Sequence, residues 1–525
     1  MVRLHGAERH GAHAGRAWPA AVFSGTLLGL SYPFGSLLAL HATAFLPVLF
    51  WFETHESASP RERASVGFLF GMVTHAISQN FEYAMLDFSW LAVVLYGAML
   101  GIYGARFAVT FALAGWLRRR TGLSWAWVLP VCWLPFEWLG TFTDLRLTID
   151  HLAHTFTHYP SLIQFADVVG HYGVGAFLLA VNALLFEATL VGGGARRRRA
   201  AIGLTLLVAA AAGYDLWAWN RDLPVEGTVR IAVVQPNIPL AVKHDRDTAA
   251  EQWAALREGT LEAAEHGPDL IVWPESARPW LVRHRVDRPE TYSMPEVEAL
   301  ARSTGAAVLL GVEYAQISAD GRAAVYNAAM AVDAEGRLMD EWGAKVYLVP
   351  FTEGVPFRSL FGPLVEGKGG EWRWLAGGFT PGPRGALVTV AGARIGALVC
   401  FEQLFPDLSR GLRNAGAEIQ VVVTNDAWFG RSYLQGFLAN ALRLRAIESR
   451  VEFVRAANTG ISGFVDRRGV YHERTGIFED AVIVRDVERS TSRTIYDRTG
   501  DLVAWLAVAA LIALSAAAAT RSRRN

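Results

Sequence analysis

The sequence predicts an α-helical membrane domain of about eight spans joined to an α/β domain outside the membrane. Of the 525 residues, 52% are hydrophobic and 19% are charged, and the mean hydropathy is +0.23. Soluble domains are usually about a quarter charged, so much of this chain is expected inside a bilayer. Long apolar runs dominate 1–220 and recur once at the end of the chain. Between them, 221–500 is mixed sequence in which apolar runs alternate with amphipathic ones.

The apolar runs divide the chain into a membrane domain at 1–220, an outer domain at 221–500, and a last span with a basic tail at 501–525. A helix needs about 20 mostly apolar residues to cross the hydrocarbon of a bilayer. The predicted spans are 18–36, 37–53, 65–84, 88–116, 123–140, 161–192, 200–219 and 501–519. The first run continues into further spans, so no cleavable signal peptide is expected.

The arginines predict which side of the membrane each loop faces. With the N-terminus inside, the cytoplasmic segments are the loops after spans 2, 4 and 6 and the C-terminus. They carry Arg61 and Arg63, then Arg118 to Arg120, then Arg196 to Arg199, and finally Arg521, Arg523 and Arg524. The opposite loops are poor in Lys and Arg except for Arg146, which agrees with the positive-inside rule. The same topology places 221–500 on the outer face.

Several polar residues lie within or beside the predicted spans: His75, Asn80, Glu82, Glu137, His151, His154 and His158. Ionisable groups inside a membrane are candidates for function. For each one singly, a hydrogen bond to a neighbouring helix is the favoured interpretation. Glu137 stands out because it is expected at the outer end of its span, facing the outer domain. No role is assigned to the histidine-bearing loop.

The outer domain is predicted to be a layered α/β sheet covered on both faces. Strand-like runs occur at 229–234, 270–273, 307–312, 325–332, 395–399, 419–424 and 452–456, and helical patterns at 247–264, 294–303 and 436–450. Nearly continuous Val, Ile and Leu runs separated by helices are typical of such sheets. The runs 324–332 and 338–347 follow one another without a helix, so part of the sheet is expected to be antiparallel.

Composition excludes several classes of function. Lys+Arg and Asp+Glu both number 49, and nucleic-acid binding would call for a basic excess. Cys132 and Cys400 are the only cysteines, too few for a disulfide framework or a cysteine zinc site. GxGxxG and Walker patterns are absent from 221–500, so no nucleotide cofactor is expected.

Three reactive side chains each follow a predicted strand, where α/β sheets place their sites. They are Glu275 in Trp-Pro-Glu-Ser, Lys345 in Ala-Lys-Val-Tyr, and Cys400 in Val-Cys-Phe-Glu. A thiol needs a base to become a thiolate and a cation to hold the oxyanion that its attack creates. Taken singly, each has a simpler explanation. Cys400 could be an inert buried cysteine, Glu275 could cap a helix, and Lys345 could be a solvated lysine on an edge strand. Together they supply the parts of one reaction.

These residues and their neighbours resemble the nitrilase superfamily, and most closely its membrane branch, the apolipoprotein N-acyltransferases. The matching segments are Gln235–Ile238, Trp273–Ser276, Lys345 with Leu348–Phe351, Glu353–Pro356, Cys400–Glu402, Asn425–Gly430, Arg445–Glu448 and Asn458–Gly460. The stretch 141–150 departs from the family pattern because it lacks a Phe-Pro-Trp element, and 433–437 lacks a Gln-His pair. The resemblance implies a four-layer αββα sandwich for 221–500.

The resemblance also implies the roles of individual residues. Cys400 would be the nucleophile, Glu275 the general base and Lys345 the oxyanion stabiliser. Glu353 would orient Lys345 or Glu275, and Glu402 is a candidate contact for the acceptor amine. The loop residues Asn425, Asp426 and Trp428 would shape the pocket beside Cys400, although ordinary packing explains Trp428 nearly as well.

The function implied is transfer of a fatty acyl chain from a phospholipid, through a thioester on Cys400, to the α-amino group of a diacylglyceryl-cysteine lipoprotein. The enzyme would lie in the bacterial inner membrane with its catalytic domain facing the periplasm, without metal or organic cofactor. Two enzymatic alternatives remain open: a membrane-bound amidase or hydrolase, in which water resolves the thioester, and an acyltransferase with a different amine acceptor. A binding module without activity is a third.

The segment 354–365 is predicted to be a loop in contact with the membrane. Its large apolar residues, Phe357, Leu360, Phe361 and Leu364, would form an exposed patch, which normally marks a membrane or partner contact. We expect this loop to form one wall of a lipid entrance, with its glycines permitting movement. The competing interpretation is that the loop folds back onto the domain core.

Overall fold

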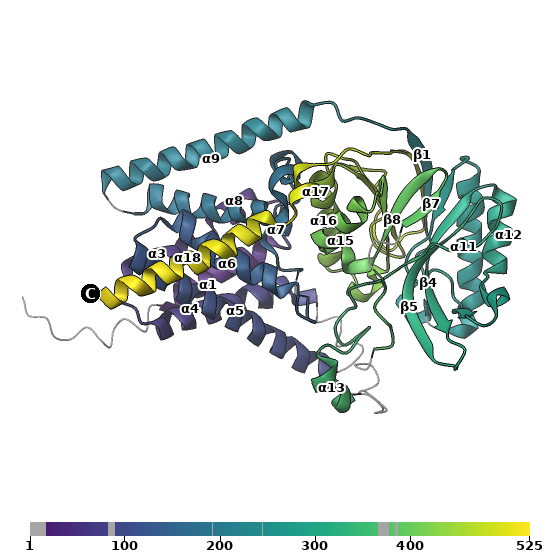
Figure 1. Cartoon of the computed structure of the whole chain (residues 1–525), viewed down its shortest axis with the longest axis horizontal. Coiled ribbons are helices and arrows are strands. Elements are labelled where there is room, and N and C mark those ends of the chain that lie inside the picture. Colours follow the sequence, from purple (N-terminus) through teal and green to yellow (C-terminus); the bar gives the residue numbers. More distant parts are fainter. Residues whose placement is uncertain are drawn as a thin grey trace, which may run out of the picture.

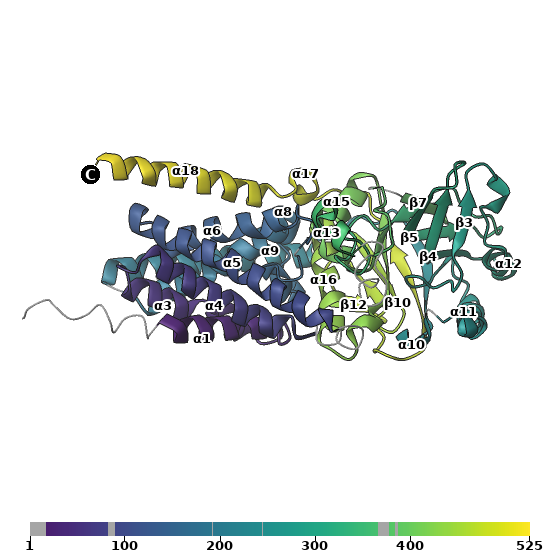
Figure 2. The same cartoon turned by 90° about the horizontal axis from the view of Figure 1, so that it is seen from below.

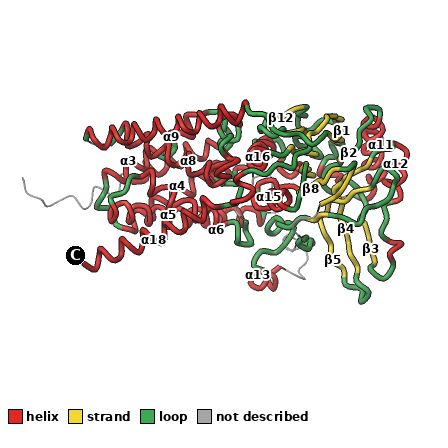
Figure 3. The backbone as a smooth tube through the Cα atoms, turned by 45° about the horizontal axis from the view of Figure 1, so that its top comes forward, coloured by secondary structure: helices red, strands yellow, loops and turns green. Residues whose placement is uncertain are grey.

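The computed structural model describes residues 17–81, 90–146, 148–191, 193–243, 245–365, 377–383 and 387–524. A helical bundle occupies one end of the elongated molecule and an α/β domain the other (Figure 1). The view at right angles shows the same division (Figure 2). Strands are confined to the α/β end, while the helices of the bundle run along the long axis (Figure 3).

The bundle consists of helices from both ends of the described chain. They are α1 (Ala17–Ser31), α2 (Leu38–Thr43), α3 (Leu46–Thr54), α4 (Pro60–Ser78), α5 (Leu91–Thr121), α6 (Trp125–Gly140), α7 (Leu152–Thr155), α8 (Ala166–Thr189), α9 (Gly194–Asn220) and α18 (Leu502–Arg524). Among the described residues, four helices are long and apolar enough to cross a membrane: 92–121, 166–189, 194–220 and 502–520. The predicted total of eight spans stays a prediction.

Two predicted spans differ from the helices observed. The span 37–53 is two short helices, α2 and α3, and Pro47 lies in the first turn of α3. Proline lacks a backbone N–H and fits the first turn of a helix but not its interior, so the chain restarts there. The span 161–192 is shorter than predicted, because a 3₁₀ turn at Pro160–Leu162 precedes α8. Glu82 lies outside the described residues.

The α/β domain contains two mixed sheets. The first has the order β13-β1-β2-β4-β5-β6, with β3 paired to β4, and the second has the order β12-β11-β10-β9-β8-β7. Their bounds are β1 (Thr228–Gln235), β2 (Leu270–Val272), β3 (Val282–Arg285), β4 (Ala307–Ile317), β5 (Ala323–Val332), β6 (Gly343–Ala344), β7 (Leu387–Val390), β8 (Ala393–Val399), β9 (Ile419–Thr424), β10 (Glu452–Ala457), β11 (Gly463–Val465), β12 (Tyr471–His472) and β13 (Ala481–Glu488). The strands β1, β2 and β4 run parallel, as do β8, β9 and β10.

The sheets stack face to face between two helical layers, which gives the αββα order (Figure 1). Alternate residues of β1 point to opposite faces, as the pleat requires: Ile231 and Val233 pack between the sheets, whereas Ala232 and Val234 pack towards the outer helices. The outer helices are α11 (Ala249–Ala264) and α12 (Pro295–Thr304), and those facing the bundle are α15 (Pro406–Asn414) and α16 (Leu434–Ser449). Short helices α10 (Leu240–Lys243), α13 (Arg358–Val365) and α17 (Ile495–Thr499) complete the domain.

Each of the seven predicted strand runs coincides with a strand, and β4 and β5 are antiparallel, as expected. The prediction for 338–347 was wrong in extent, because a strand forms with β5 only at Gly343–Ala344, while Leu338 makes a single isolated bridge to Val332 at the end of β5. The strand ends at Ala344, and Lys345 follows it directly. Sequence analysis did not predict the short strands β3, β7, β11 and β12, nor β13, although Val482–Val484 is a β-branched run typical of a strand.

The predicted histidine loop joins the bundle to the α/β domain. His151 Nδ1 and His171 Nε2 on α8 lie 2.9 Å apart, and His171 Nδ1 lies 3.1 Å from the guanidinium of Arg445 on α16. Glu137 is buried and accepts hydrogen bonds from Trp133 and from the backbone N–H of Leu152 at 3.0 Å. The His171–Arg445 contact links the bundle to the α/β domain, whereas the Glu137 contacts lie within the bundle; both favour the structural interpretation.

Candidate active site

Two of the three predicted reactive side chains meet at the carboxyl ends of strands in the first sheet, and the third follows a strand of the second sheet. Glu275 follows β2, Lys345 follows β6 and Cys400 follows β8. The ammonium of Lys345 lies 3.5 Å from Glu275 Oε1 and 2.7 Å from Glu353 Oε1. It also lies 5.2 Å from the ring centroid of Phe401, the residue after Cys400. Glu353 therefore contacts Lys345, as predicted.

The backbone at the site is strained at two positions. Cys400 has φ +59° and begins a 3₁₀ turn, Cys400–Leu404, and Ser276 beside Glu275 has φ +47°. Non-glycine residues in this region cost of order 1–3 kcal/mol and persist where the surrounding fold holds them. A Cβ on Gly311 would lie 2.5 Å from Glu275 Cα, so β4 can approach the Glu275 turn only with glycine there. The fold thus forces these turns into place.

Glu275 is held by two hydrogen-bond donors and one ion pair. Its Oε1 accepts a hydrogen bond from Asn327 Nδ2 at 2.7 Å, and its Oε2 accepts one from the backbone N–H of Asn425 at 2.8 Å. The ion pair is with Lys345. The same Asn327 amide lies 3.3 Å from Glu353 Oε1, and the Asn327 carbonyl accepts from the backbone N–H of Lys345. Sequence analysis missed Asn327, although a buried amide in the apolar strand β5 is a polar exception that marks a site.

Electrostatics set the resting protonation of the Cys400 thiol. Burial, and after it the charge of Glu275, raises the pKa of the Cys400 thiol, against the opposing effect of Lys345. Burial disfavours the Lys345 ammonium, but the charges of Cys400, Glu353 and Glu275 outweigh it and raise the pKa of Lys345. At neutral pH the resting site therefore holds a thiol beside a fixed cation. Such a thiol needs a base to become nucleophilic.

Both carboxylate oxygens of Glu402 accept hydrogen bonds from backbone N–H groups. Its Oε1 accepts from the N–H groups of Val346 at 2.6 Å and Tyr347 at 3.1 Å, and its Oε2 accepts from Val399 at 2.9 Å. Burial raises the pKa of Glu402 to about 7, against these three donors. The predicted contact with the acceptor amine is thus not favoured. Instead, Glu402 ties the segment that carries Lys345 to the turn that carries Cys400.

The predicted loop after β9 has a similar supporting function. Asp426 is fully buried and pairs with Arg455 at 2.8 Å. The side chain of Asn425 accepts from Asn458 Nδ2 at 3.1 Å, while its backbone N–H holds Glu275. Trp428 is half-buried in the 3₁₀ turn Asp426–Phe429. Asn425 therefore contacts a reactive residue, Glu275, through its backbone N–H.

Lys243 is a second cation near the site that sequence analysis missed. It is 5% exposed, and its ammonium has no hydrogen-bond partner among the described residues. Burial lowers the pKa of Lys243 to about 8, against the charges of Glu275 and Glu313. Within the ranges that the structure describes, no three His, Cys, Asp or Glu side chains are grouped as a metal site requires.

Two family models match the chain. The carbon-nitrogen hydrolase model matches 230–497, which contains every reactive residue above. The model of the apolipoprotein N-acyltransferase N-terminal domain matches 24–184, within the helical bundle. A protein named apolipoprotein N-acyltransferase from Geobacter metallireducens is 32% identical over 530 residues, which cover 96% of both chains. The chain belongs to the apolipoprotein N-acyltransferase family.

Other apolipoprotein N-acyltransferases are similar over comparable lengths. The protein of that name from Gloeobacter violaceus is 31% identical, covering 96% of this chain and 95% of its own. Among solved structures, a mutant of the Nesterenkonia AN1 amidase from the nitrilase superfamily aligns at 19% identity and a TM-score of 0.35. That alignment covers 50% of this chain and 92% of the amidase.

Asn327 is predicted to position Glu275. Asn327→Leu removes a donor to the charged carboxylate, so the acid limb of the pH profile for Cys400 alkylation should move to higher pH. Acyl transfer should fall by about one to two orders of magnitude, the cost of leaving a buried acceptor unpaired. Alkylation rates measured across pH check this. A lower yield of folded protein with an unchanged pH profile would contradict the positioning role.

Proposed function

We propose that this protein is an N-acyltransferase of lipoprotein maturation in the bacterial inner membrane. It would move an acyl chain from a phospholipid to the N-terminal amine of a diacylglyceryl-cysteine lipoprotein. The observation that carries the proposal is the Lys345 ammonium, held between Glu275 and Glu353 and next to the Cys400 turn, on a domain fixed to an apolar helical bundle. Family membership supports the same reaction.

In the first step, Glu275 takes the proton of the Cys400 thiol as sulfur attacks the ester carbonyl of the phospholipid. Lys345 stabilises the oxyanion of the tetrahedral intermediate, because a fixed cation in a buried site needs no reorganisation as charge develops. The carbon–oxygen bond then breaks, and the leaving alkoxide takes the proton from Glu275. Lysophospholipid departs and a thioester remains on Cys400.

In the second step, the α-amino group of the lipoprotein attacks the thioester carbonyl. Glu275 accepts the amine proton, Lys345 again holds the oxyanion, and the carbon–sulfur bond breaks. The departing thiolate recovers the proton from Glu275, which restores the resting thiol. The product is an amide, and the two steps require neither a metal nor an organic cofactor.

The proposed topology has eight spans, with the N-terminus in the cytoplasm and the α/β domain in the periplasm. Three structural facts support this orientation. The arginine cluster Arg118–Arg120 ends α5, the cluster Arg196–Arg199 begins α9, and α18 ends in a basic tail. The start of α9 and the end of α18 lie at the end of the bundle remote from the α/β domain (Figures 1 and 2). The positive-inside rule then assigns the α/β domain to the outer face.

Mass spectrometry of a lipoprotein N-terminus tests the reaction. Incubation of the purified protein with phospholipid and a diacylglyceryl-cysteine lipopeptide should add one acyl chain to the peptide and release lysophospholipid. Lysophospholipid with free fatty acid and no acylated peptide would instead identify a hydrolase. Acylation of an unrelated amine at the same rate would identify an acyltransferase with a different acceptor.

Lipid is proposed to reach the site past α13. The predicted loop 354–365 is a short helix from Arg358 onward and irregular before it, with Phe357, Leu360 and Leu364 exposed and Phe361 half-buried. Val365 at its end packs against Leu95 of α5, which brings the exposed patch to the border between the bundle and the α/β domain (Figure 1).

A double change, Leu360→Ser with Leu364→Ser, should therefore impair transfer from bilayer phospholipid and spare alkylation of Cys400 by a small soluble reagent. These positions are better targets than Phe361, whose ring packs 6.0 Å from that of Phe351. Rates of both reactions in reconstituted vesicles and in buffer check this. If both rates fall together, α13 belongs to the core of the domain and the lipid entrance lies elsewhere.

A further inference from the structure

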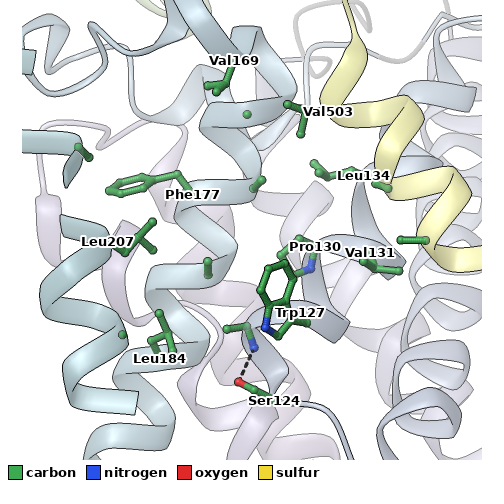
Figure 4. Close-up of a pocket in the computed structure, with 18 of the residues that line it drawn as sticks. Ser124, Trp127, Pro130, Val131, Leu134, Val169, Phe177, Leu184, Leu207 and Val503 are labelled. Atoms are coloured by element: carbon green, nitrogen blue, oxygen red, sulfur yellow. Dashed lines mark hydrogen bonds between the residues drawn. The ribbon is translucent and has the colours of Figure 1, made fainter. Parts of the chain in front are cut away.

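An apolar cavity lies in the bundle, away from the reactive residues. It has a volume of about 1200 Å³ and runs between α6, α8, α9 and α18. In Figure 4, Phe177 and Leu184 of α8 face Leu207 of α9, and Trp127 and Leu134 of α6 line the other side. None of Glu275, Lys345 or Cys400 lines it.

Small residues create this space. Gly173, Ala176 and Ala180 of α8 and Gly203 and Ala210 of α9 line the cavity. In membrane bundles such residues usually allow helices to pack closely, and here they also line the cavity. Only Ala200, Asp215 and Ala218 of α9 are buried, so this long apolar helix is weakly covered by protein. An apolar occupant would complete its packing.

The cavity carries excess positive charge at the end remote from the α/β domain. Arg118, Arg196, Arg199 and Glu187 line that end. Arg196 pairs with Glu53 and with Glu187, and Arg118 pairs with Glu53, so both carboxylates are engaged. In the described part of the chain, Arg199 pairs with no carboxylate, and its recorded bond is a long one, 3.4 Å to the Ala195 carbonyl. An anion beside Arg199 would balance the excess.

We propose that this groove binds a membrane phospholipid as a structural lipid, with its acyl chains between α8, α9 and α18 and its phosphate at Arg199. This proposal is independent of the proposed reaction, since the headgroup would lie at the end of the bundle opposite the reactive site. The bound lipid would brace α9, which leads into β1, and α18, which follows α17. These are the two helices that connect the α/β domain to the bundle on either side of it in sequence.

Native mass spectrometry of the full-length protein in detergent tests this, with phosphatidylglycerol as the probe. The wild type should retain one lipid. Arg199→Gln should lower retention about fivefold, the effect of one basic residue on an anionic lipid, whereas the neighbouring Arg198→Gln should leave it unchanged. Ala210 lines the groove, so Ala210→Phe should fill it and abolish retention, whereas Ala209→Phe, at a neighbouring position that does not line the groove, should not.

Three outcomes would overturn the proposal. Equal losses with Arg198→Gln and Arg199→Gln would indicate a diffuse basic surface rather than a site. Equal retention by Ala210→Phe and Ala209→Phe would place the lipid outside the groove. A second copy of the chain, present in the wild type and lost with Ala210→Phe, would identify a protein occupant instead.

Discussion

Cys400→Ser should reduce acyl transfer by about 10⁶, the loss expected when the nucleophile of an interdependent catalytic unit is removed. Intact-mass analysis after incubation with phospholipid should show one added acyl chain on the wild type and none on the variant. The physical reason is that no other thiol can replace it. Cys132, the second cysteine, is fully buried in α6 within the apolar bundle, where a thiolate is costly to form.

Cys132→Ala is the matched control for this experiment. It should retain the adduct and transfer activity close to that of the wild type, because its side chain lies remote from the reactive cluster. Proteolysis of the acylated protein should locate the added mass on the peptide that contains Cys400. An adduct that survives Cys400→Ser, or that maps to Cys132, would refute the assignment of the nucleophile.

The reactive residues were accessible from sequence because Glu275 and Cys400 each follow an apolar run. Such runs, at 270–272 and 395–399, predict buried strands, and the residue after the strand lies at its carboxyl end, where α/β sheets place their sites. The adjacent Pro274 and the contiguous Cys-Phe-Glu added specific motifs. Local pattern therefore predicted which side chains are presented at the edge, and the resemblance predicted their chemistry.

The supporting contacts depend on tertiary pairing, which local sequence does not specify. Asn327 bridges Glu275 and Glu353 only because β5 pairs with β4 and β6 in one particular register. Glu402 looked like a substrate contact because it lies two residues after Cys400. Its Oε1 instead accepts the backbone N–H groups of Val346 and Tyr347, more than fifty residues earlier in the chain, and its Oε2 accepts that of Val399.

The membrane part shows the same division between local pattern and packing. Hydropathy located a helix at every predicted span. It did not anticipate that 37–53 would divide into α2 and α3 near Pro47. Hydropathy averaged over many residues is insensitive to a single proline that lacks a backbone N–H. Nor did it predict the contact between His171 and Arg445, which joins α8 to a helix of the other domain.

Glu275→Gln and Lys345→Met should separate activation of the thiol from stabilisation of the oxyanion. A general base contributes about 10² to 10⁴ in rate, and loss of an oxyanion donor costs about 10² to 10³. Alkylation of Cys400 by a small reagent needs the thiolate but forms no oxyanion. Glu275→Gln should therefore slow both alkylation and acyl transfer.

Lys345→Met should nearly stop acyl transfer and leave more of the alkylation, although loss of the cation also raises the pKa of the Cys400 thiol, because Lys345 favours its charged form. Glu296→Gln is the matched control, since this half-buried carboxylate pairs with Arg278 at the far layer of helices and touches no reactive residue. Rates of alkylation and transfer for the three variants supply the comparison. Equal alkylation in the wild type and Glu275→Gln would rule out Glu275 as the base. Equal losses of both reactions in Lys345→Met would indicate that Lys345 is only a structural partner of Glu275 and Glu353.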